Sequence, residues 1–395
     1  MATTAGTTAV ETDTAPLVDG FGRVHRDLRI SVTDRCNFRC TYCMPADGLQ
    51  WQPAESVLTA AELARVARRC VERFGFTSIR LTGGEPTVRA DLVDLAEDLA
   101  RLPVDLSLTT NGSRLERLAP RLVAAGLRRV NVSLDSLRPD RFAATTRRDA
   151  LPDGVAGIRA AVSAGLDPVK VNVVLTRGVN DDEVVDFARF GRDEGVVVRF
   201  IEFMPLDADQ RWTRSSVVPS AEVLEQIHRV FPLVAEEPGS SPARLHRYAD
   251  GLGEVGVIGS VTEPFCSRCD RVRLTADGQL RSCLFATDET DLRAILRDPG
   301  LSLASGEPGP REPGQPGGQS AVAVFVIASM LAGLSQNMAQ LIGTRALQGI
   351  GGGGIMVLVM AVIADLIPPR DRGRYAGLFG AVFGLSSVVG PLLGG

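Results

Sequence analysis

Six of the seven cysteines fall into two spaced triplets, and these residues are the best suited to chemistry. Their spacings are C-x3-C-x2-C for Cys36, Cys40 and Cys43, and C-x2-C-x13-C for Cys266, Cys269 and Cys283. A cubane iron–sulfur cluster has four irons, so three thiolates leave one iron open to a non-protein ligand. The spacing therefore predicts two [4Fe–4S] clusters, each able to hold a small molecule on its metal.

Zinc and disulfides are simpler interpretations of the same triplets. Structural zinc prefers four ligands, and His246 is the histidine that could complete the second triplet. Disulfides need an oxidising compartment. Residues 1–20 lack the basic start of a signal peptide, so we expect them to form a disordered leader. The seventh cysteine, Cys70, lies in a helical pattern and is expected to be a small buried apolar residue.

The balance of cationic residues is unusual. Lys170 is the only lysine among 43 Lys and Arg residues. A lysine retained in so arginine-rich a chain indicates a contact that suits a compact ammonium, such as one to phosphate or to a purine edge. The alternative is that Lys170 was retained by chance. Arg268, Arg271 and Arg273 lie beside the second triplet and predict an anion site. A net charge of −4 argues against a general nucleic-acid binder.

Strand-like runs alternate with amphipathic helical patterns between residues 28 and 203. The predicted strands are 28–33, 78–82, 105–109, 129–133, 169–175 and 196–203, and the clearest helices are 60–74, 115–125 and 181–190. This alternation predicts a parallel sheet. Six strand–helix units indicate an α/β barrel that stops short of the usual eight.

Unusual sequence follows most of these strands directly. The first cysteine triplet follows the first strand, and the motifs TGGEP (82–86), TTNG (109–112), SLD (133–135) and EFMP (202–205) follow or close later ones. Parallel α/β barrels build their active sites at the carboxyl ends of the strands. We therefore expect these motifs to meet at one mouth.

Composition divides the remainder of the chain. We expect a partial barrel over 21–220, and a smaller second-cluster domain over 221–298 with a hairpin turn at Asp277 and Gly278. A Pro/Gly-rich linker follows over 299–320. The uniformly apolar residues 321–395 predict transmembrane helices over 321–342, 347–367 and 375–395.

Several motifs together resemble the radical S-adenosylmethionine superfamily and, more closely, its GTP 3′,8-cyclase family. They are RDLRISVTDRCNFRCTYCMP, RLTGGEPTVR, NVSLD, VKVNVV, RFIEFMP and FCSRCDRVRLTADGQLRSCLF. The likeness covers roughly residues 20–298 and implies an incomplete (β/α)6 barrel with a small C-terminal cluster-binding domain. It implies a lyase that converts GTP to (8S)-3′,8-cyclo-7,8-dihydroguanosine 5′-triphosphate, the first step of molybdenum cofactor (molybdopterin) biosynthesis.

The resemblance also assigns residues to ligands. The residues that it places at S-adenosylmethionine are Tyr42, Gly84, Ser133 and Met204. Those that it places at GTP are Arg29, Arg80, Thr109, Lys170, Arg271, Val272 and Arg273. The cysteines would hold the two clusters, and the chemistry would run through a 5′-deoxyadenosyl radical rather than a side-chain acid or base.

The same resemblance implies the surroundings of the enzyme. We expect a cytoplasmic protein that is reduced by a flavodoxin or ferredoxin. Its product would pass to cyclic pyranopterin monophosphate synthase. No nucleic-acid partner is expected, a homodimer is allowed, and residues 321–395 allow membrane association.

The chain departs from this family after about Asp298. Residues 321–395 instead resemble part of a major facilitator superfamily multidrug exporter, through RALQGIGGGG, PPRDRGRYAGLFGAVFG and GPLLGG. Two rival interpretations stay open: another twin-cluster radical enzyme, and a non-functional chimera with a transporter fragment.

Overall fold

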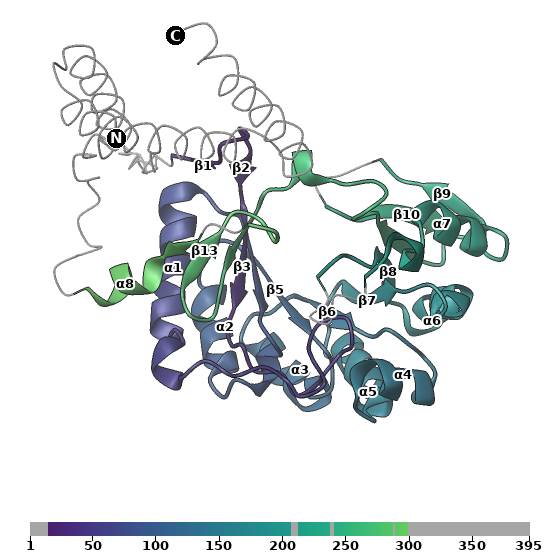
Figure 1. Cartoon of the computed structure of the whole chain (residues 1–395), viewed down its shortest axis with the longest axis horizontal. Helices are drawn as coiled ribbons and strands as arrows, with labels where there is room; N and C mark the ends of the chain where they lie inside the picture. The colour runs from purple at the N-terminus through teal and green to yellow at the C-terminus, as the bar shows by residue number, and fades with distance from the viewer. Residues whose placement is uncertain (1–14, 207–211, 238–240, 287–288, 299–395) are drawn as a thin grey trace, which may run out of the picture. The chain divides into compact units, whose positions relative to one another are not determined.

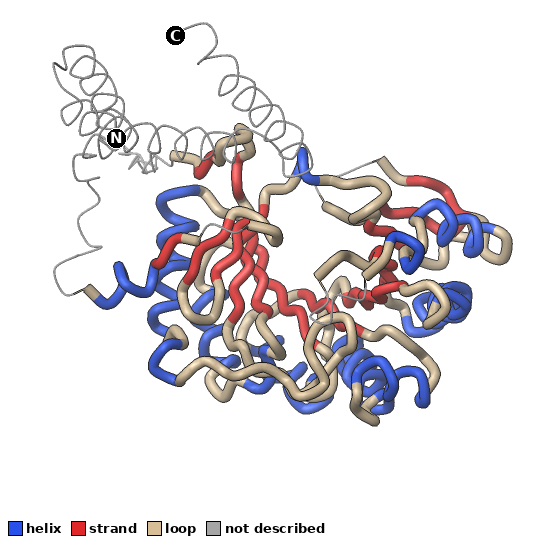
Figure 2. Tube along the Cα trace, in the orientation of Figure 1, coloured by secondary structure: helices blue, strands red, loops and turns tan. Residues whose placement is uncertain are grey.

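A twelve-stranded sheet with an open, curved arrangement organises the described part of the chain (Figures 1 and 2). The computed structural model describes residues 15–206, 212–237, 241–286 and 289–298. Its strand order is β14-β13-β12-β3-β4-β5-β6-β7-β8-β11-β10-β9. The six central strands are parallel: β3 (Asp27–Ser31), β4 (Ser78–Thr82), β5 (Asp105–Thr110), β6 (Arg129–Ser133), β7 (Val169–Leu175) and β8 (Val197–Glu202). The predicted incomplete barrel is confirmed.

Helices connect these strands and cover the outer face of the arc (Figure 2). Helix α1 (Ala60–Phe74) begins at a capping box between Thr59 and Glu62 and ends at Gly75 in the left-handed conformation. The helices that follow are α2 (Leu92–Ala100), α3 (Leu115–Ala124), α4 (Pro139–Thr146), α5 (Leu151–Ser163) and α6 (Val184–Glu194).

The two faces of the central strands differ in chemistry. Leu28 and Ile30 of β3 are fully buried in the hydrophobic core, and Asp27 and Arg29 alternate with them along the strand. Side chains alternate between faces along a strand, so the polar residues face away from that core. The register between neighbouring strands aligns these polar residues, since Arg29 of β3 lies opposite Arg80 of β4. The inner face of this parallel sheet is therefore polar.

The C-terminal strands extend this sheet at both edges. On the β8 side lie β11 (Glu254–Ile258), β10 (Arg244–Tyr248) and β9 (Leu233–Ala235). On the β3 side lie β12 (Arg271–Leu274), β13 (Gln279–Arg281) and β14 (Thr290–Asp291). The segment that crosses from one edge to the other carries Cys266 and Cys269.

Short helices accompany these strands. They are α7 (Ser220–His228) and α8 (Leu292–Arg297). The hairpin prediction is confirmed, because β12 pairs antiparallel with β13 and Gly278 has φ +87°. Strands from both sides of the predicted domain boundary at residues 220 and 221 share one sheet, so the sheet does not mark that boundary. The boundary therefore stays a prediction.

The remaining predictions concern the leader, Cys70, the linker and the transmembrane segments. Leu17–Val18, within the expected leader, forms β1 and pairs with β2 (Val24–His25). Cys70 packs against the core, and burial raises the pKa of its thiol to about 12. The linker 299–320 and the transmembrane segments within 321–395 lie outside the described residues. Within the described ranges, no helix is both long and apolar enough to cross a bilayer.

Candidate active site

The first cysteine loop follows β3 and forms a compact turn. The backbone N–H groups of Cys43 and Met44 donate to the carbonyl of Cys40 at 3.0 and 2.9 Å. The N–H of Phe38 donates to the sulfur of Cys36 at 3.4 Å. Burial raises the pKa values of all three thiols, so without a positive ligand they hold their protons. Three thiols that need a metal to ionise, carried by one short turn, fit a cluster with one open iron.

Tyr42 ties this loop to the carboxyl end of β6. Its hydroxyl donates to Asp135 Oδ2 at 2.6 Å, and Val174 N–H donates to Oδ1 at 2.8 Å. Asp135 is 3% exposed, and burial raises the pKa of its carboxyl to about 6. Burial and this neighbouring carboxylate raise the pKa of Tyr42. The tyrosine hydroxyl is thus already used, which leaves its ring and backbone for S-adenosylmethionine.

The TGGEP motif packs its backbone against the cysteine loop. Gly84 N–H donates to Thr33 O at 2.8 Å, and a Cβ on Gly84 would lie 2.3 Å from Arg35 O. Only glycine tolerates such a close approach. The buried Glu85 carboxylate accepts a bond from Thr110 Oγ1 at 2.6 Å, which joins this motif to β5. Gly84 therefore keeps only its carbonyl for a ligand.

The other residues that the resemblance assigns to S-adenosylmethionine lie at the same edge of the sheet. Ser133 ends β6, and Met204 follows β8. The six strands are parallel, so their carboxyl ends meet where the cysteine loop leaves β3. Parallel topology thus brings Tyr42, Gly84, Ser133 and Met204 to one edge, and their contacts with the ligand stay predictions.

A cationic cavity of about 190 Å³ opens on the inner face of the sheet. Its lining includes Cys269 of the second triplet, seven cationic side chains and two carboxylates. The cationic residues are Arg29, Arg80, Arg129, Lys170, Arg199, Arg268 and Arg271, and the acidic residues are Asp27 and Asp270. This excess of positive charge fits a multiply charged anion such as a triphosphate.

Arg199 is the most deeply buried of these cations. It is 5% exposed, and its Nη2 donates to the side-chain oxygens of Asn131 and Asn172, each at 2.7 Å. Burial, with Arg80 and Arg129 nearby, lowers the pKa of Arg199 to about 9. Neutral amides hold the guanidinium in place without cancelling its charge. An anionic ligand would supply the missing neutralisation.

Lys170 lies in the same charged surroundings on β7. Burial first, and then Arg199 and Arg129, lower the pKa of its ammonium to about 8. Glu254 acts in the opposite direction. Lys170 therefore titrates closer to neutrality than a free lysine does.

The second triplet borders this cavity. Arg271 Nε donates to the sulfur of Cys269 at 3.2 Å, and the guanidinium of Arg271 lies 4.9 Å from the centroid of the Phe265 ring. The N–H of Phe285 donates to the sulfur of Cys283 at 3.5 Å. Charged and N–H donors to sulfur suit a thiolate ligand. A cluster held here would face the cationic cavity directly.

A single-ion site is the zinc alternative. In the described ranges, no three His, Cys, Asp or Glu side chains converge to hold one metal ion. His246, the candidate fourth ligand, lies on β10 with Nδ1 buried and without a hydrogen bond. This finding concerns single ions and not clusters.

Comparisons with known proteins match three family models to successive parts of the chain from residue 30 onward. Residues 30–191 match the Radical SAM superfamily, 196–304 match Molybdenum Cofactor Synthesis C, and 319–395 match the Major Facilitator Superfamily. A GTP 3′,8-cyclase from Streptomyces coelicolor is 53% identical over 286 residues, which cover 71% of this chain and 84% of that one. This chain belongs to the GTP 3′,8-cyclase family.

Further members of the GTP 3′,8-cyclase family align over the same region. The cyclase of Mycobacterium sp. (strain KMS) is 52% identical over 72% of this chain and 82% of its own. GTP 3′,8-cyclase 2 of Mycobacterium tuberculosis (strain H37Rv) is 51% identical over 72% and 81%. SuiB of Streptococcus suis shares the fold alone, at 14% identity and a TM-score of 0.50, over 71% of this chain and 67% of that one.

The residues that resemblance to the cyclase family assigns to GTP divide into two groups. Arg29, Arg80, Lys170 and Arg271 line the cationic cavity. The remaining three do not line it: Thr109, Val272 and Arg273. Thr109 Oγ1 accepts a bond from Asn131 at 3.3 Å. Val272 is 2% exposed within the hydrophobic core, so its side chain is not available to a ligand.

Arg129 and Arg199 line the cavity, although neither was predicted from the sequence. A signal was present for Arg199, because it stands between Val198 and Phe200 in a strand. A cation in a strand that helices cover is costly unless the opposite face is polar. Alternation within β8 could therefore have identified Arg199, whereas Arg129 begins β6 next to Arg128 and carries no such signal.

Proposed function

We propose that residues 21–298 cyclise GTP to (8S)-3′,8-cyclo-7,8-dihydroguanosine 5′-triphosphate, the first step of molybdenum cofactor biosynthesis. The observation that carries the proposal is the cationic cavity, which has Cys269 in its wall. Family membership at 53% identity supports the same reaction. The cofactors are S-adenosylmethionine and two [4Fe–4S] clusters, held by Cys36, Cys40 and Cys43 and by the second triplet.

When bound, the first cluster and S-adenosylmethionine supply the 5′-deoxyadenosyl radical that starts the reaction. The residues of the chain bind and orient. Arg29, Arg80, Lys170 and Arg199 would bind the triphosphate, and Arg271 would hold the substrate near Cys269. The partly enclosed wall would exclude water and keep the ribose still, which matters because radical chemistry depends on placement.

Anaerobic turnover tests this assignment. The reconstituted chain, GTP, S-adenosylmethionine and a strong reductant should give the cyclised triphosphate and 5′-deoxyadenosine in equal amounts, measured by mass spectrometry. Two results together would favour another twin-cluster radical enzyme. The first is formation of 5′-deoxyadenosine from S-adenosylmethionine without cyclised GTP, and the second is that GTP does not protect the backbone amides of the chain from hydrogen exchange. The proposed partners are a flavodoxin or ferredoxin as reductant and cyclic pyranopterin monophosphate synthase as the next enzyme.

A second candidate is a chimera with little activity. The observation that favours it is the match of residues 319–395 to the Major Facilitator Superfamily, directly after the cyclase region. We propose a cytoplasmic location for the enzyme part, with membrane association through 321–395 if that segment is made. Reading the gene afresh across codons 295–325 tests whether the fusion exists.

A further inference from the structure

The first cysteine loop rests on a segment that lies far away in the sequence, at the end of α4. Arg39 N–H donates to Thr146 O at 3.0 Å, and Thr41 N–H donates to Thr145 O at 2.9 Å. These bonds align the loop backbone with the last turn of α4. The following residue, Arg147, extends the contact through its side chain.

Arg147 brackets two of the three cluster cysteines. Its Nη1 donates to Arg39 O at 2.8 Å and to Met44 O at 3.0 Å. These two carbonyls stand just before Cys40 and just after Cys43. One guanidinium nitrogen therefore fixes both ends of the four-residue turn that carries two thiols. We call these two hydrogen bonds the Arg147 clasp. Arg39 and Arg147 lie 108 positions apart in the sequence, so the clasp forms only in the folded chain.

The backbone of Arg147 is itself strained. It has φ 54° and ψ 33°, and in the described ranges it is the only residue other than glycine with a positive φ. A branched or long side chain pays a steric penalty in this left-handed region. Such strain persists where the surroundings over-determine the conformation, which typically happens at functional sites. Here the left-handed turn directs the guanidinium back over the cysteine loop.

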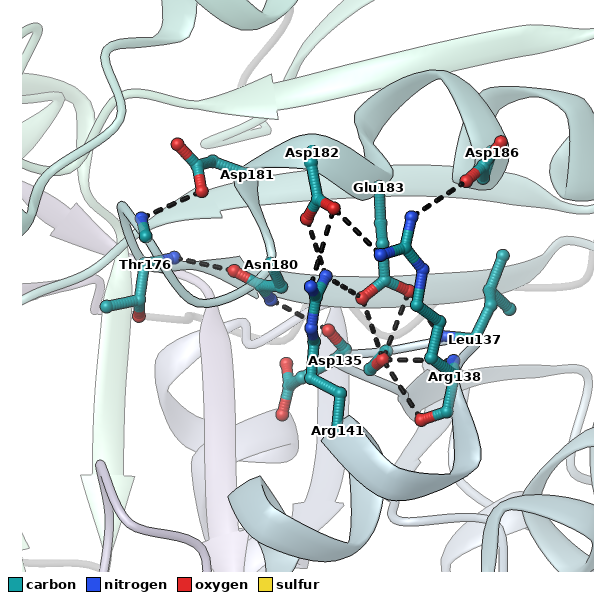
Figure 3. A network of polar contacts seen from close by, with 12 residues as sticks. Asp135, Leu137, Arg138, Arg141, Thr176, Asn180, Asp181, Asp182, Glu183 and Asp186 are labelled. Carbon is teal, nitrogen blue, oxygen red and sulfur yellow. Dashed lines mark hydrogen bonds and ion pairs between the residues drawn. The ribbon is translucent and has the colours of Figure 1, made fainter.

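A second network holds α4 in place (Figure 3). Arg141 of α4 donates to the fully buried carboxylate of Glu183 at 2.6 Å and also bonds Asp182 at 2.5 Å. Glu183 further accepts bonds from Ser136 Oγ at 2.8 Å and Leu137 N–H at 2.7 Å. These contacts join the loop before α4, and the first turn of α4 itself, to the residues just before α6. The network therefore fixes the start of α4, the helix whose other end carries Arg147.

We propose that Arg147 is a positioning residue that holds the first cysteine loop in its cluster-binding conformation. The inference rests on the part of the proposed function that assigns a cluster to Cys36, Cys40 and Cys43. It does not depend on GTP being the substrate. Arg147 acts through the backbone of the loop, at the carbonyls of Arg39 and Met44.

Arg147→Gly in the full chain tests this role. Glycine adopts the left-handed conformation without strain, so the fold should persist while the clasp is lost. The matched control is Arg159→Ala, which removes an exposed guanidinium paired with Glu194 on α5. Replacing Cys266, Cys269 and Cys283 by alanine in a parallel set leaves iron only at the first triplet.

The first measurement is iron loss to a chelator after anaerobic reconstitution. Arg147→Gly should lose iron from the first triplet about tenfold faster, because two hydrogen bonds that close the loop are gone. Arg147→Lys should recover part of this difference, since an ammonium can replace one donor. Arg159→Ala should behave as wild type. The melting temperature of Arg147→Gly should stay close to the wild-type value, because relief of the left-handed strain offsets the lost hydrogen bonds. An unchanged melting temperature separates positioning from general stability.

Two further readouts do not require turnover. In the iron-free protein, alkylation of Cys40 followed by peptide mass spectrometry should be several-fold faster in Arg147→Gly. In the reduced protein, the electron paramagnetic resonance change on adding S-adenosylmethionine should weaken in Arg147→Gly but not in Arg159→Ala.

Equal iron loss in wild type and Arg147→Gly would overturn the positioning role alone. A fall in melting temperature with no rescue by lysine would overturn it in favour of a general structural role. If wild type bound no iron at the first triplet, the cluster assignment and this inference would both fail.

Discussion

Lys170 offers a direct test of the cationic cavity, because its charge state should change when a triphosphate binds. Burial beside Arg199 and Arg129 lowers the pKa of the free ammonium to about 8. A bound anion favours the charged form and should return the pKa to about 10.4, the ordinary lysine value. Binding above pH 8 must therefore take up a proton, whereas binding at pH 7 does not.

The magnitude follows from these two pKa values. At pH 7 about nine-tenths of the free ammonium is already charged, and at pH 9 only about one-tenth is. Linkage then weakens GTP affinity about tenfold between pH 7 and pH 9, which equals about 1.4 kcal/mol. Isothermal titration calorimetry of the cluster-loaded chain measures the Kd. Buffers with different ionisation enthalpies report the proton uptake.

The variant Lys170→Arg isolates the part of the pH dependence of GTP binding that comes from Lys170. Its guanidinium stays charged, so the part of the pH dependence that Lys170 causes should vanish, while the titration of GTP itself is common to both proteins. At pH 7 the variant should bind GTP more weakly by about 1–3 kcal/mol, because a planar fork cannot reproduce a compact contact. Since Lys170 is the only lysine, 13C reductive methylation labels it with the N-terminal amine alone, and NMR gives its pKa directly. Identical pH slopes in wild type and Lys170→Arg, or a methylated Lys170 that titrates near 10.4 without GTP, would refute the reasoning.

Three other predictions follow from the structure. Anaerobic reconstitution should give about eight irons per chain by colorimetric assay, and about four irons or bound zinc would contradict two clusters. Tyr42→Phe should lower the free energy of unfolding of the iron-free chain by about 1–3 kcal/mol in urea titrations, because it leaves the buried Asp135 carboxylate short of a donor. Tyr248→Phe is the matched control, because the Tyr248 hydroxyl makes a long, weak hydrogen bond of 3.4 Å to Ala188 O. An equal loss of unfolding free energy in both variants would contradict the argument. The full chain should turn over GTP more slowly in detergent than a version whose residues after Asp298 are replaced by a complete cyclase C-terminus; equal rates would show that the usual tail is dispensable.

The sequence alone predicted the parallel strands, and it supplied the cysteines that stay the predicted cluster ligands. Cysteine spacing is local, so C-x3-C-x2-C can be read without knowing what packs around it. Strands β4, β6 and β7 were predicted with the bounds that the structure has, because hydrophobic alternation between turn residues is also local. The motifs after the strands were correctly expected at one edge, since parallel topology alone places strand ends together.

The composition of the cavity wall depended on the tertiary structure. Arg199 contacts Asn131 and Asn172 only because β6, β7 and β8 are neighbours in a particular register. Thr109 and Val272 resemble family ligands in sequence, yet neither side chain lines the cavity. The pleat decides which face a strand residue occupies, and that face becomes binding surface or core only after the sheet curves.

Contacts between distant segments were likewise invisible in the sequence. The pairing of β12 with β3 brings Cys269 to the cavity, and Arg147 reaches the first cysteine loop across more than a hundred positions. Such contacts depend on which strand occupies an open sheet edge and on a left-handed backbone angle at one arginine. Local sequence fixes which residues can bind metal, whereas long-range pairing decides what surrounds them, because its free energy comes from segments that meet only on folding.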